Sequence, residues 1–162
     1  MRLVFLAVTL LVSSGPPAAA ADIADRVVVH KERRLLQLFQ GDQVVREYAV
    51  ALGGNPLGHK RQEGDERTPE GLYLLDWRNP GSGYHKSIHV SYPAPADVAA
   101  AAARGVDPGG MIMIHGQRNY FGWLAFLTQR FDWTNGCIAV TNAQMDEIWT
   151  MVPNNTPIEI KP

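Results

Sequence analysis

The one cysteine of the sequence is the residue most capable of chemistry. Cys137 lies in the stretch WTNGCIAVTN at residues 133–142, and no second cysteine exists to pair with it. Such a thiol is an apolar filler of the core, half of an intermolecular disulfide or a nucleophile. A free thiol has a pKa near ~8.5, so a nucleophilic cysteine needs a base or a cation beside it. His115, which ends an apolar stretch 22 positions upstream, is the candidate base.

The residues next to both candidates suit a catalytic loop. Gly116 follows His115 and lets the backbone turn sharply, and Gly136 permits a positive φ just before the thiol. We therefore expect consecutive main-chain N–H groups from Asn135 to Cys137 to converge on an oxyanion. The histidine precedes the cysteine in this chain, which argues against a papain-like protease, where the cysteine comes first.

These residues must be positioned by a mainly β domain. Short stretches rich in β-branched and aliphatic residues, separated by turn residues, predict strands over much of the chain, the first three of them antiparallel. The stretch MIMIH is apolar at four successive positions and predicts a fully buried strand that ends at His115. The predicted strands lie within residues 25–31, 34–40, 44–52, 71–77, 87–92, 111–115 and 156–162.

Helices are expected to be few and short. Pro95 near the start, an alanine-rich body and a glycine stop predict a helix over residues 96–104. Thr141, followed by Gln144 three residues later, forms a capping-box pattern and predicts a second helix with one apolar face. The segment 119–131, between the histidine and the cysteine, is also expected to be helical, although its glycine weakens the pattern.

The first residues have the pattern of an export signal. Arg2 precedes the apolar run 3–12, and small residues suited to signal-peptidase cleavage follow it. Ten mostly apolar residues are too few to span a bilayer. We therefore predict a signal peptide at residues 1–21 and a single domain at residues 22–162. The protein is expected to be exported to the periplasm or cell wall, without stable membrane insertion.

Neither nucleic acid nor a metal ion fits the distribution of charged and histidine residues. The formal net charge is −1 at pH 7, whereas nucleic-acid binding needs an excess of Lys and Arg contacts to phosphate. His85 and His89 are four residues apart, but their surroundings predict a strand, and no cluster of Cys, Asp or Glu completes a metal site. We expect no cofactor. His89 is expected either to line the substrate cleft or to be a hydrogen-bonded structural residue.

Three motifs together resemble one known family. IHGQ at residues 114–117 and DWTNGCIAVTN at 132–142 are similar to the His-Gly and Ser/Thr-x-Gly-Cys signatures of the L,D-transpeptidase catalytic domain (YkuD type), a family of bacterial cell-wall enzymes. GDERTPEGLY at 64–73 resembles the family's Gly-x-x-x-Thr-Pro-x-Gly segment. The likeness runs from about residue 26 to the end of the chain and is strongest to the periplasmic branch that includes the enzyme detaching lipoprotein from murein. The family fold, a mainly β sandwich with a few short helices, agrees with the predicted strands.

The resemblance implies a role for each matching residue. Cys137 corresponds to the nucleophile, His115 to its base, and the carbonyl of Gly116 to the acceptor that orients the imidazole. Thr134 occupies the Ser/Thr position, where its hydroxyl holds the loop or touches substrate. One position departs from the pattern. Ala139 stands where many members carry Arg, which removes a cation that binds a substrate carboxylate or supports the thiolate.

The implied reaction is acyl transfer through a thioester on peptidoglycan stem peptides that contain diaminopimelate. An amine acceptor gives a crosslink, and water gives a hydrolase: an amidase, a carboxypeptidase or endopeptidase, or an enzyme that releases murein-bound lipoprotein. The alternative from a different class is a peptidoglycan-binding module with an inert Cys137. Trp133 is expected to shield the site from solvent. Asp65 and Arg67, just before Pro69, fit a solvated turn better than a substrate site.

Overall fold

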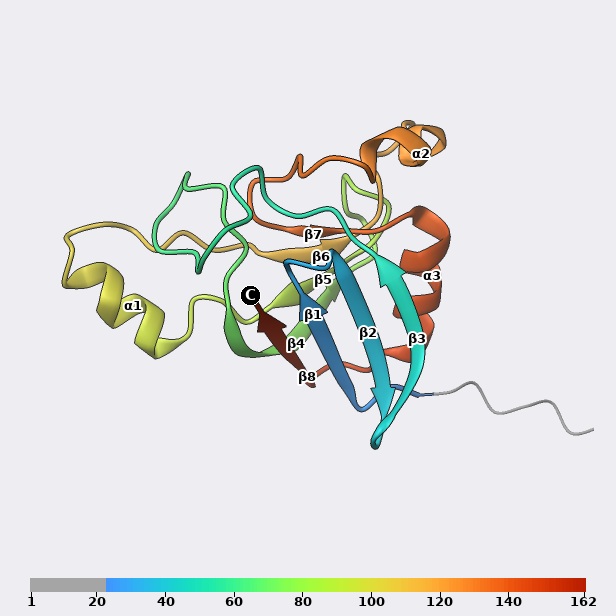
Figure 1. The fold of residues 1–162 in the computed structure, drawn as a ribbon, viewed down its shortest axis with the longest axis horizontal. Coiled ribbons are helices and arrows are strands. Elements are labelled where there is room, and N and C mark those ends of the chain that lie inside the picture. Colours follow the sequence, from blue (N-terminus) through green and yellow to red (C-terminus); the bar gives the residue numbers. More distant parts are fainter. Residues whose placement is uncertain (1–22) are drawn as a thin grey trace, which may run out of the picture.

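The computed structural model describes residues 23–162 and is built mainly from β-strands (Figure 1). The predicted signal peptide, residues 1–21, lies outside the described residues. The mainly β fold class is confirmed. The helices are α1 (Pro95–Ala102), α2 (Ala125–Thr128) and α3 (Asn142–Met151), with a 3-10 helix at Gly122–Leu124. The strands are β1 (Arg26–His30), β2 (Leu35–Gln40), β3 (Gln43–Ala49), β4 (Gly71–Asn79), β5 (Ser87–Val90), β6 (Met113–His115), β7 (Ile138–Ala139) and β8 (Thr156–Lys161).

The strands of residues 23–162 form one curled sheet in the order β3-β2-β1-β8-β4-β5-β6-β7. β1, β2 and β3 form the predicted antiparallel meander. β8 joins this meander to the other half of the sheet, because it pairs parallel with β1 and antiparallel with β4. In Figure 1 the half with β1 to β3 lies in front of the half with β5 to β7. Both halves contribute to a common core, which includes Val29, Leu36, Ile88 and Ile114, with Met145 from α3.

The two strands that carry the candidate residues are short. β6 covers Met113–His115 and not the predicted 111–115, because Met111 has a positive φ of 54° and an exposed side chain. β7 consists of Ile138–Ala139 alone. It is not predicted from the sequence, since two residues carry no periodicity. The main chain of Ala139 also exchanges hydrogen bonds of 2.8 and 2.9 Å with Ala51, so β7 is held on both sides.

The helices follow their local signals to different degrees. The capping box of α3 is confirmed, because Gln144 N donates to Thr141 Oγ1 at 3.3 Å and Thr141 N donates to Gln144 Oε1 at 3.0 Å. α1 begins one residue before the predicted start and ends two residues early. The segment 119–131 is helical only over 122–128, as a 3-10 turn followed by the four-residue α2. No helix within residues 23–162 has the length and apolar character needed to cross a membrane.

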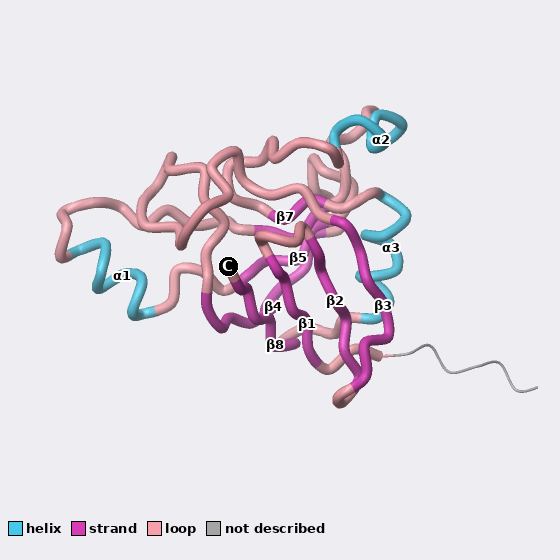
Figure 2. The backbone as a smooth tube through the Cα atoms, viewed as in Figure 1, coloured by secondary structure: helices cyan, strands magenta, loops and turns pink. Residues whose placement is uncertain are grey.

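A buried lysine fastens the long loop between β3 and β4 to the end of β1. Lys31 is 2% exposed, and its Nζ donates to the carbonyls of Gly58 at 2.6 Å and Thr68 at 2.9 Å and to Glu70 Oε1 at 2.8 Å. All three N–H groups of the ammonium are thereby used. Figure 2 shows this loop on the same side of the sheet as the loops that flank β7. The segment that carries the TPEG motif is therefore fixed at both ends.

Candidate active site

β6 and β7 place the candidate base and nucleophile on one face of the sheet. The two strands are parallel, with Ile114 opposite Ile138 and His115 opposite Ala139. Side chains alternate between faces along a strand, so Cys137, just before β7, shares the face of Ala139 and therefore that of His115. The two candidate residues are thus diagonal neighbours on adjacent strands.

His115 is held in one tautomer and is neutral at pH 7. Its ring is 4% exposed, and Nδ1 lies 2.6 Å from the main-chain oxygen of Gly116. Because a carbonyl only accepts, Nδ1 carries the hydrogen and Nε2 has the free lone pair. Burial lowers the pKa of His115 below its ordinary value of 6.5, although the hydrogen bond to the Gly116 carbonyl acts in the opposite direction. A neutral imidazole with an unprotonated Nε2 is the form that a general base needs.

Two aromatic side chains enclose the imidazole. The ring centroid of Tyr84 lies 4.7 Å from that of His115, and Trp133 makes an edge contact at 5.8 Å. Both also line an apolar cavity of about 360 Å³, together with Phe121 and Leu124. The indole Nε1 of Trp133 is buried and has no hydrogen-bond partner within residues 23–162. The position expected to shield the site therefore also supplies an unsatisfied donor beside this cavity.

Cys137 is partly exposed, and its thiol is protonated at rest. Sγ lies 3.6 Å from the carbonyl oxygen of Met111, to which it donates a weak hydrogen bond. Burial of the sulfur raises the pKa of the Cys137 thiol, while a main-chain hydrogen bond from Met113 and the charge of Lys60 lower it. Sγ is bonded to the Met111 carbonyl rather than to His115. Proton transfer to Nε2 therefore requires rotation of the cysteine side chain.

The turn before the thiol is built by one hydroxyl and one glycine. Thr134 Oγ1 donates to the carbonyl of Cys137 at 2.7 Å and accepts from the N–H of Gly136 at 3.2 Å, so its hydroxyl holds the turn. Contact between this hydroxyl and substrate stays a prediction. Gly136 has a φ of 118°, and a Cβ there would lie 2.6 Å from the carbonyl oxygen of Arg67. Of the three N–H groups expected at an oxyanion hole, that of Gly136 is engaged. Those of Asn135 and Cys137 have no partner among the described residues.

An ion pair anchors the segment that leads into this turn. Arg34 Nη2 lies 2.6 Å from Asp132 Oδ2, and its Nε donates to the same carboxylate at 3.0 Å. Asp132 Oδ1 also accepts from the N–H of Leu52 at 2.9 Å. The main chain of Thr134 then continues the contact, since its N–H donates to the Leu52 carbonyl at 3.1 Å. The thiol is therefore supported by the β1–β2 turn and by the loop that follows β3.

His89 lies opposite Met113 of β6 and so shares the sheet face of His115, but its polar and ring contacts are to β4 and not to the candidate pair. His89 Nδ1 lies 2.7 Å from Asp76 Oδ1, and the ring stacks on Trp77 with centroids 4.9 Å apart. These contacts fit the structural one of its two expected roles. His85 is also engaged elsewhere, with Nε2 at 2.7 Å from Asp146 Oδ1. Within residues 23–162, no group of three or more His, Cys, Asp or Glu side chains is placed to hold a metal ion.

Nearly the whole described chain matches one protein family. Residues 24–160 match the L,D-transpeptidase catalytic domain family (YkuD). The chain belongs to this family. A curated protein of Escherichia coli (strain K12), named "Putative L,D-transpeptidase YafK", is 32% identical to this L,D-transpeptidase domain over 133 residues, which are 78% of this chain and 46% of that protein. The chain thus spans about half the length of the curated relatives it matches.

Solved structures with a similar fold support the same family fold. The helical cell shape determining protein Pgp2 from Campylobacter jejuni has a TM-score of 0.65 at 24% identity, over 87% of this chain and 49% of that one. An L,D-transpeptidase from Mycobacterium smegmatis has a TM-score of 0.57 at 14% identity, over 86% of this chain and 59% of that one. At these identities the likeness concerns the fold, and it confirms the one implied by the sequence motifs.

Three residues around the candidate site of this L,D-transpeptidase domain are not predicted from the sequence. Tyr84 contacts the imidazole, Met111 accepts from the thiol, and the charge of Lys60 acts on the thiol. Met111 stands in an apolar run that predicts a strand interior, and Tyr84 lies in a loop without a pattern. Only Lys60 has a usable signal, because it precedes the recognised GDERTPEG motif in the same loop.

Proposed function

We propose that the protein is an exported peptidoglycan L,D-transpeptidase that acts in the periplasm or cell wall through a thioester at Cys137. The observation that supports this proposal best is the common sheet face of Cys137 and His115, with a tautomer that leaves Nε2 of His115 free. Family membership indicates the substrate class, which is the stem peptides of peptidoglycan. The resemblance adds diaminopimelate as the residue at the point of reaction.

The first half-reaction forms the acyl-enzyme. The thiol of Cys137 turns from Met111 toward His115, Nε2 takes its proton, and the thiolate attacks the amide carbonyl of the donor stem peptide. The tetrahedral oxyanion accepts hydrogen bonds from the main-chain N–H groups of Asn135 and Cys137. As the C–N bond breaks, His115 gives the proton to the departing amine. A thioester to Cys137 and a neutral imidazole remain.

The resting pair is a neutral thiol and a neutral imidazole, because burial raises the pKa of Cys137 and lowers that of His115. Both directions disfavour a preformed thiolate–imidazolium ion pair. We therefore expect proton transfer to accompany attack on a bound carbonyl and not to precede it. Reaction with small alkylating reagents at neutral pH should accordingly be slow, and it should accelerate as pH rises.

The second half-reaction decides between ligase and hydrolase. An acceptor amine gives its proton to Nε2 of His115, attacks the thioester and displaces the Cys137 thiolate, which takes the proton back. Water in place of the amine gives hydrolysis, including release of a murein-bound lipoprotein. We place transpeptidation first, because the cavity beside His115 has a volume of about 360 Å³, enough for part of an acceptor, and a mostly apolar surface, which favours a bound acceptor over water. Ala139, in place of a common Arg, keeps hydrolysis as the second candidate.

Mass spectrometry of the intact protein tests the acyl-enzyme. Incubation with a diaminopimelate stem tetrapeptide should add the mass of the acyl group, and the adduct should be absent from Cys137→Ala. Muropeptide digests then separate new diaminopimelate-to-diaminopimelate crosslinks from trimmed stems or released lipoprotein. If the wild-type protein forms no adduct, and wild type and Cys137→Ala bind peptidoglycan equally well, the result would contradict acyl transfer and favour the binding module.

A further inference from the structure

A second cavity opens on the thiol side of the candidate site. We name it the Lys60 cavity. It has a volume of about 330 Å³, and the residues that line it come from three separate loops. Its volume is within the range of small-ligand sites. The lining residues are Lys60, Glu63, Gly64, Glu66, Gly109, Gly110 and Asn135.

Two residues that line the Lys60 cavity are close in sequence to Cys137 or to its hydrogen-bond partner. Asn135 stands two residues before Cys137, and Gly110 directly precedes Met111, whose carbonyl accepts from Sγ at 3.6 Å. The facing loops are joined by a hydrogen bond of 2.8 Å from the N–H of Glu63 to the carbonyl of Asp107. The charge of Lys60 acts on the Cys137 thiol, so a molecule bound at Lys60 is near the candidate nucleophile. The Lys60 cavity shares no lining residue with the aromatic cavity of Tyr84 and Trp133.

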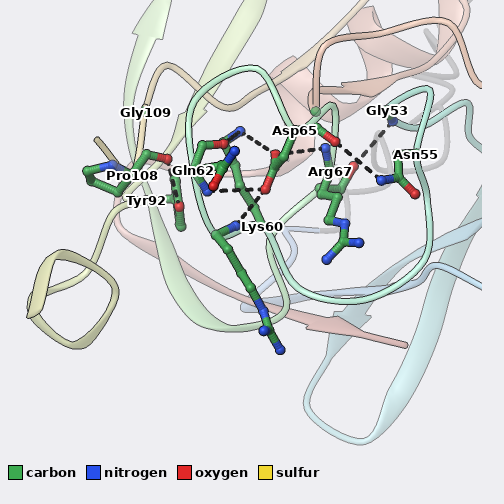
Figure 3. Close-up of polar contacts among 12 residues, drawn as sticks. Gly53, Asn55, Lys60, Gln62, Asp65, Arg67, Tyr92, Pro108 and Gly109 are labelled. Atoms are coloured by element: carbon green, nitrogen blue, oxygen red, sulfur yellow. Dashed lines mark hydrogen bonds and ion pairs between the residues drawn. The ribbon is translucent and has the colours of Figure 1, made fainter. Parts of the chain in front are cut away.

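Lys60 is a buried cation with an unused donor. Its side chain is 3% exposed, and Nζ donates to Asp65 Oδ1 at 2.9 Å and to the carbonyl of Gln62 at 3.0 Å. An ammonium group has three donors, so one remains for a ligand in the cavity that this side chain lines. The arrangement is rigid, because Asp65 also accepts from the main-chain N–H groups of Arg61, Gln62 and Arg67 (Figure 3).

The charges of the Lys60 cavity are separated by depth. Lys60 is buried, whereas Glu63 and Glu66 are exposed and place two carboxylates at the rim. The backbone of Glu66 is fixed, since its carbonyl accepts from the N–H of Asn55 at 3.2 Å. Lys60 is already paired with Asp65, so Glu63 and Glu66 give the cavity an excess of negative charge that would repel a simple anion. A group with an inner carboxylate, which accepts the third N–H of Lys60, and an outer ammonium group, which lies between the two glutamates, matches both parts.

We infer that the Lys60 cavity binds the zwitterionic free end of the substrate's diaminopimelate residue, with its carboxylate on Lys60 and its ammonium group between Glu63 and Glu66. This inference rests on the proposed function, which supplies the diamino acid. One centre of that residue is used in the stem peptide, and the other keeps a free α-carboxylate and α-ammonium group. Lys60 then supplies the carboxylate-binding cation that Ala139 lacks.

Binding to Cys137→Ala protein tests the inference without turnover. Isothermal titration calorimetry would compare the stem tetrapeptide, the same peptide with the free diaminopimelate carboxylate amidated, and the same peptide with the free amine acetylated. Each modification should weaken binding by about tenfold or more, as expected for the loss of a charged hydrogen bond. Equal binding of the three peptides, or no binding of the unmodified one, would overturn the inference.

Variants in the same Cys137→Ala background assign the two charges. Lys60→Gln should remove the preference for the free carboxylate and Lys60→Arg should restore part of it, whereas Glu63→Gln with Glu66→Gln should remove the preference for the free amine. Asp42→Asn, in the β2–β3 turn, is the matched control and should leave all three affinities unchanged. If Lys60→Gln fails to fold, as judged by circular dichroism, the test depends on the double variant of the two exposed glutamates. If that double variant still prefers the peptide with the free amine, the proposed site is rejected.

Adduct formation by the wild-type protein separates this inference from the proposed function. Acylation of Cys137 at equal rates by all three peptides would leave the proposed function standing and remove the Lys60 cavity as a specificity site. Selective binding of the unmodified peptide without any adduct would support the Lys60 cavity as a binding site and contradict the proposed acyl transfer. A rate advantage for the unmodified peptide that appears in KM and not in kcat supports both.

Discussion

Thr134 and Cys137 are joined across the turn by a hydrogen bond of 2.7 Å from the threonine hydroxyl to the cysteine carbonyl. The same hydroxyl accepts from the N–H of Gly136 at 3.2 Å, and the threonine is only 5% exposed, so water has little access to replace it. One side chain thus orients the peptide group that precedes Gly136 and the one that follows Cys137. The peptide group between them carries the N–H of Cys137, one of the two donors that we assign to the oxyanion.

Substitution of Thr134 should affect catalysis more than folding. Thr134→Val removes both hydrogen bonds and keeps the shape, which should cost about 1–2 kcal/mol of stability and slow acylation of Cys137 by about tenfold. Thr134→Ser keeps the hydroxyl and should acylate at close to the wild-type rate. Adduct formation followed by mass spectrometry, with thermal unfolding in parallel, measures both effects. Equal acylation rates for the Val and Ser variants would show that the hydroxyl does not organise the turn.

The buried imidazole should make stability depend on pH in a defined direction. The folded pKa of His115 is lowered, so the unfolded chain binds this proton first as pH falls. The free energy of unfolding should therefore hold above about pH 6.5 and decrease below it, until the folded pKa is reached. His115→Gln should remove this component. Urea unfolding of both proteins at pH 7.5, 6.5 and 5.5 gives the difference, in which other titrating groups cancel. Parallel profiles would contradict the burial effect.

Loss of the buried ammonium should destabilise the loop that carries the TPEG motif. Lys31→Met leaves the Glu70 carboxylate and two carbonyls without their shared donor, and should reduce the free energy of unfolding by about 3 kcal/mol. The double variant Lys31→Met with Glu70→Gln removes the uncompensated charge and should recover part of the loss. Chemical denaturation measures both. A single variant as stable as the wild type would show that the ammonium is not a structural anchor.

Two substitutions of Trp133, at the edge of the apolar cavity, distinguish the contribution of packing from that of hydrogen bonding. Trp133→Phe removes an unsatisfied buried N–H and should change stability by less than about 1 kcal/mol. Trp133→Ala removes the ring that packs on His115 and should cost about 2 kcal/mol, less than for a fully buried Trp. If the indole N–H binds substrate, the Phe variant should acylate more slowly despite its stability. If Trp133→Phe is acylated at the wild-type rate, the indole N–H does not bind substrate and Trp133 acts through packing alone.

The parts of the fold that follow from local signals are the ones predicted from the sequence. The β1–β3 meander and the capping box of Thr141 and Gln144 each depend on residues close in the chain. β7 depends instead on bridges to distant residues, with β6 on one side and Ala51 on the other. No periodicity can report a two-residue strand, so its existence is a property of the tertiary structure.

The residues of the candidate site also fall into two groups, those that the sequence indicates and those whose position depends on the tertiary structure. Cys137 and His115 are identified by residue type, because a lone thiol and a histidine followed by glycine are visible in the sequence. The position of Lys60 depends on a loop wound around Asp65, and that of Met111 on a positive φ of 54°. Neither feature leaves a repeating pattern. Sequence therefore identifies the candidate reacting residues, and the charges around them depend on the folded loops.

The place of β8 in the sheet has a consequence for the timing of folding. β8 is inserted between β1 and β4, and among the strands of residues 23–162 no other one joins the two half-sheets. A chain that lacks residues 156–161 can pair β1 with β2 and β2 with β3, but it has no strand to place between β1 and β4. His115 and Cys137 lie on the β4 to β7 side of the sheet, whereas Arg34, which pairs with Asp132 before the candidate thiol, lies between β1 and β2 on the other side. Joining the two half-sheets depends on contacts that are distant in sequence, which makes this step of folding slow.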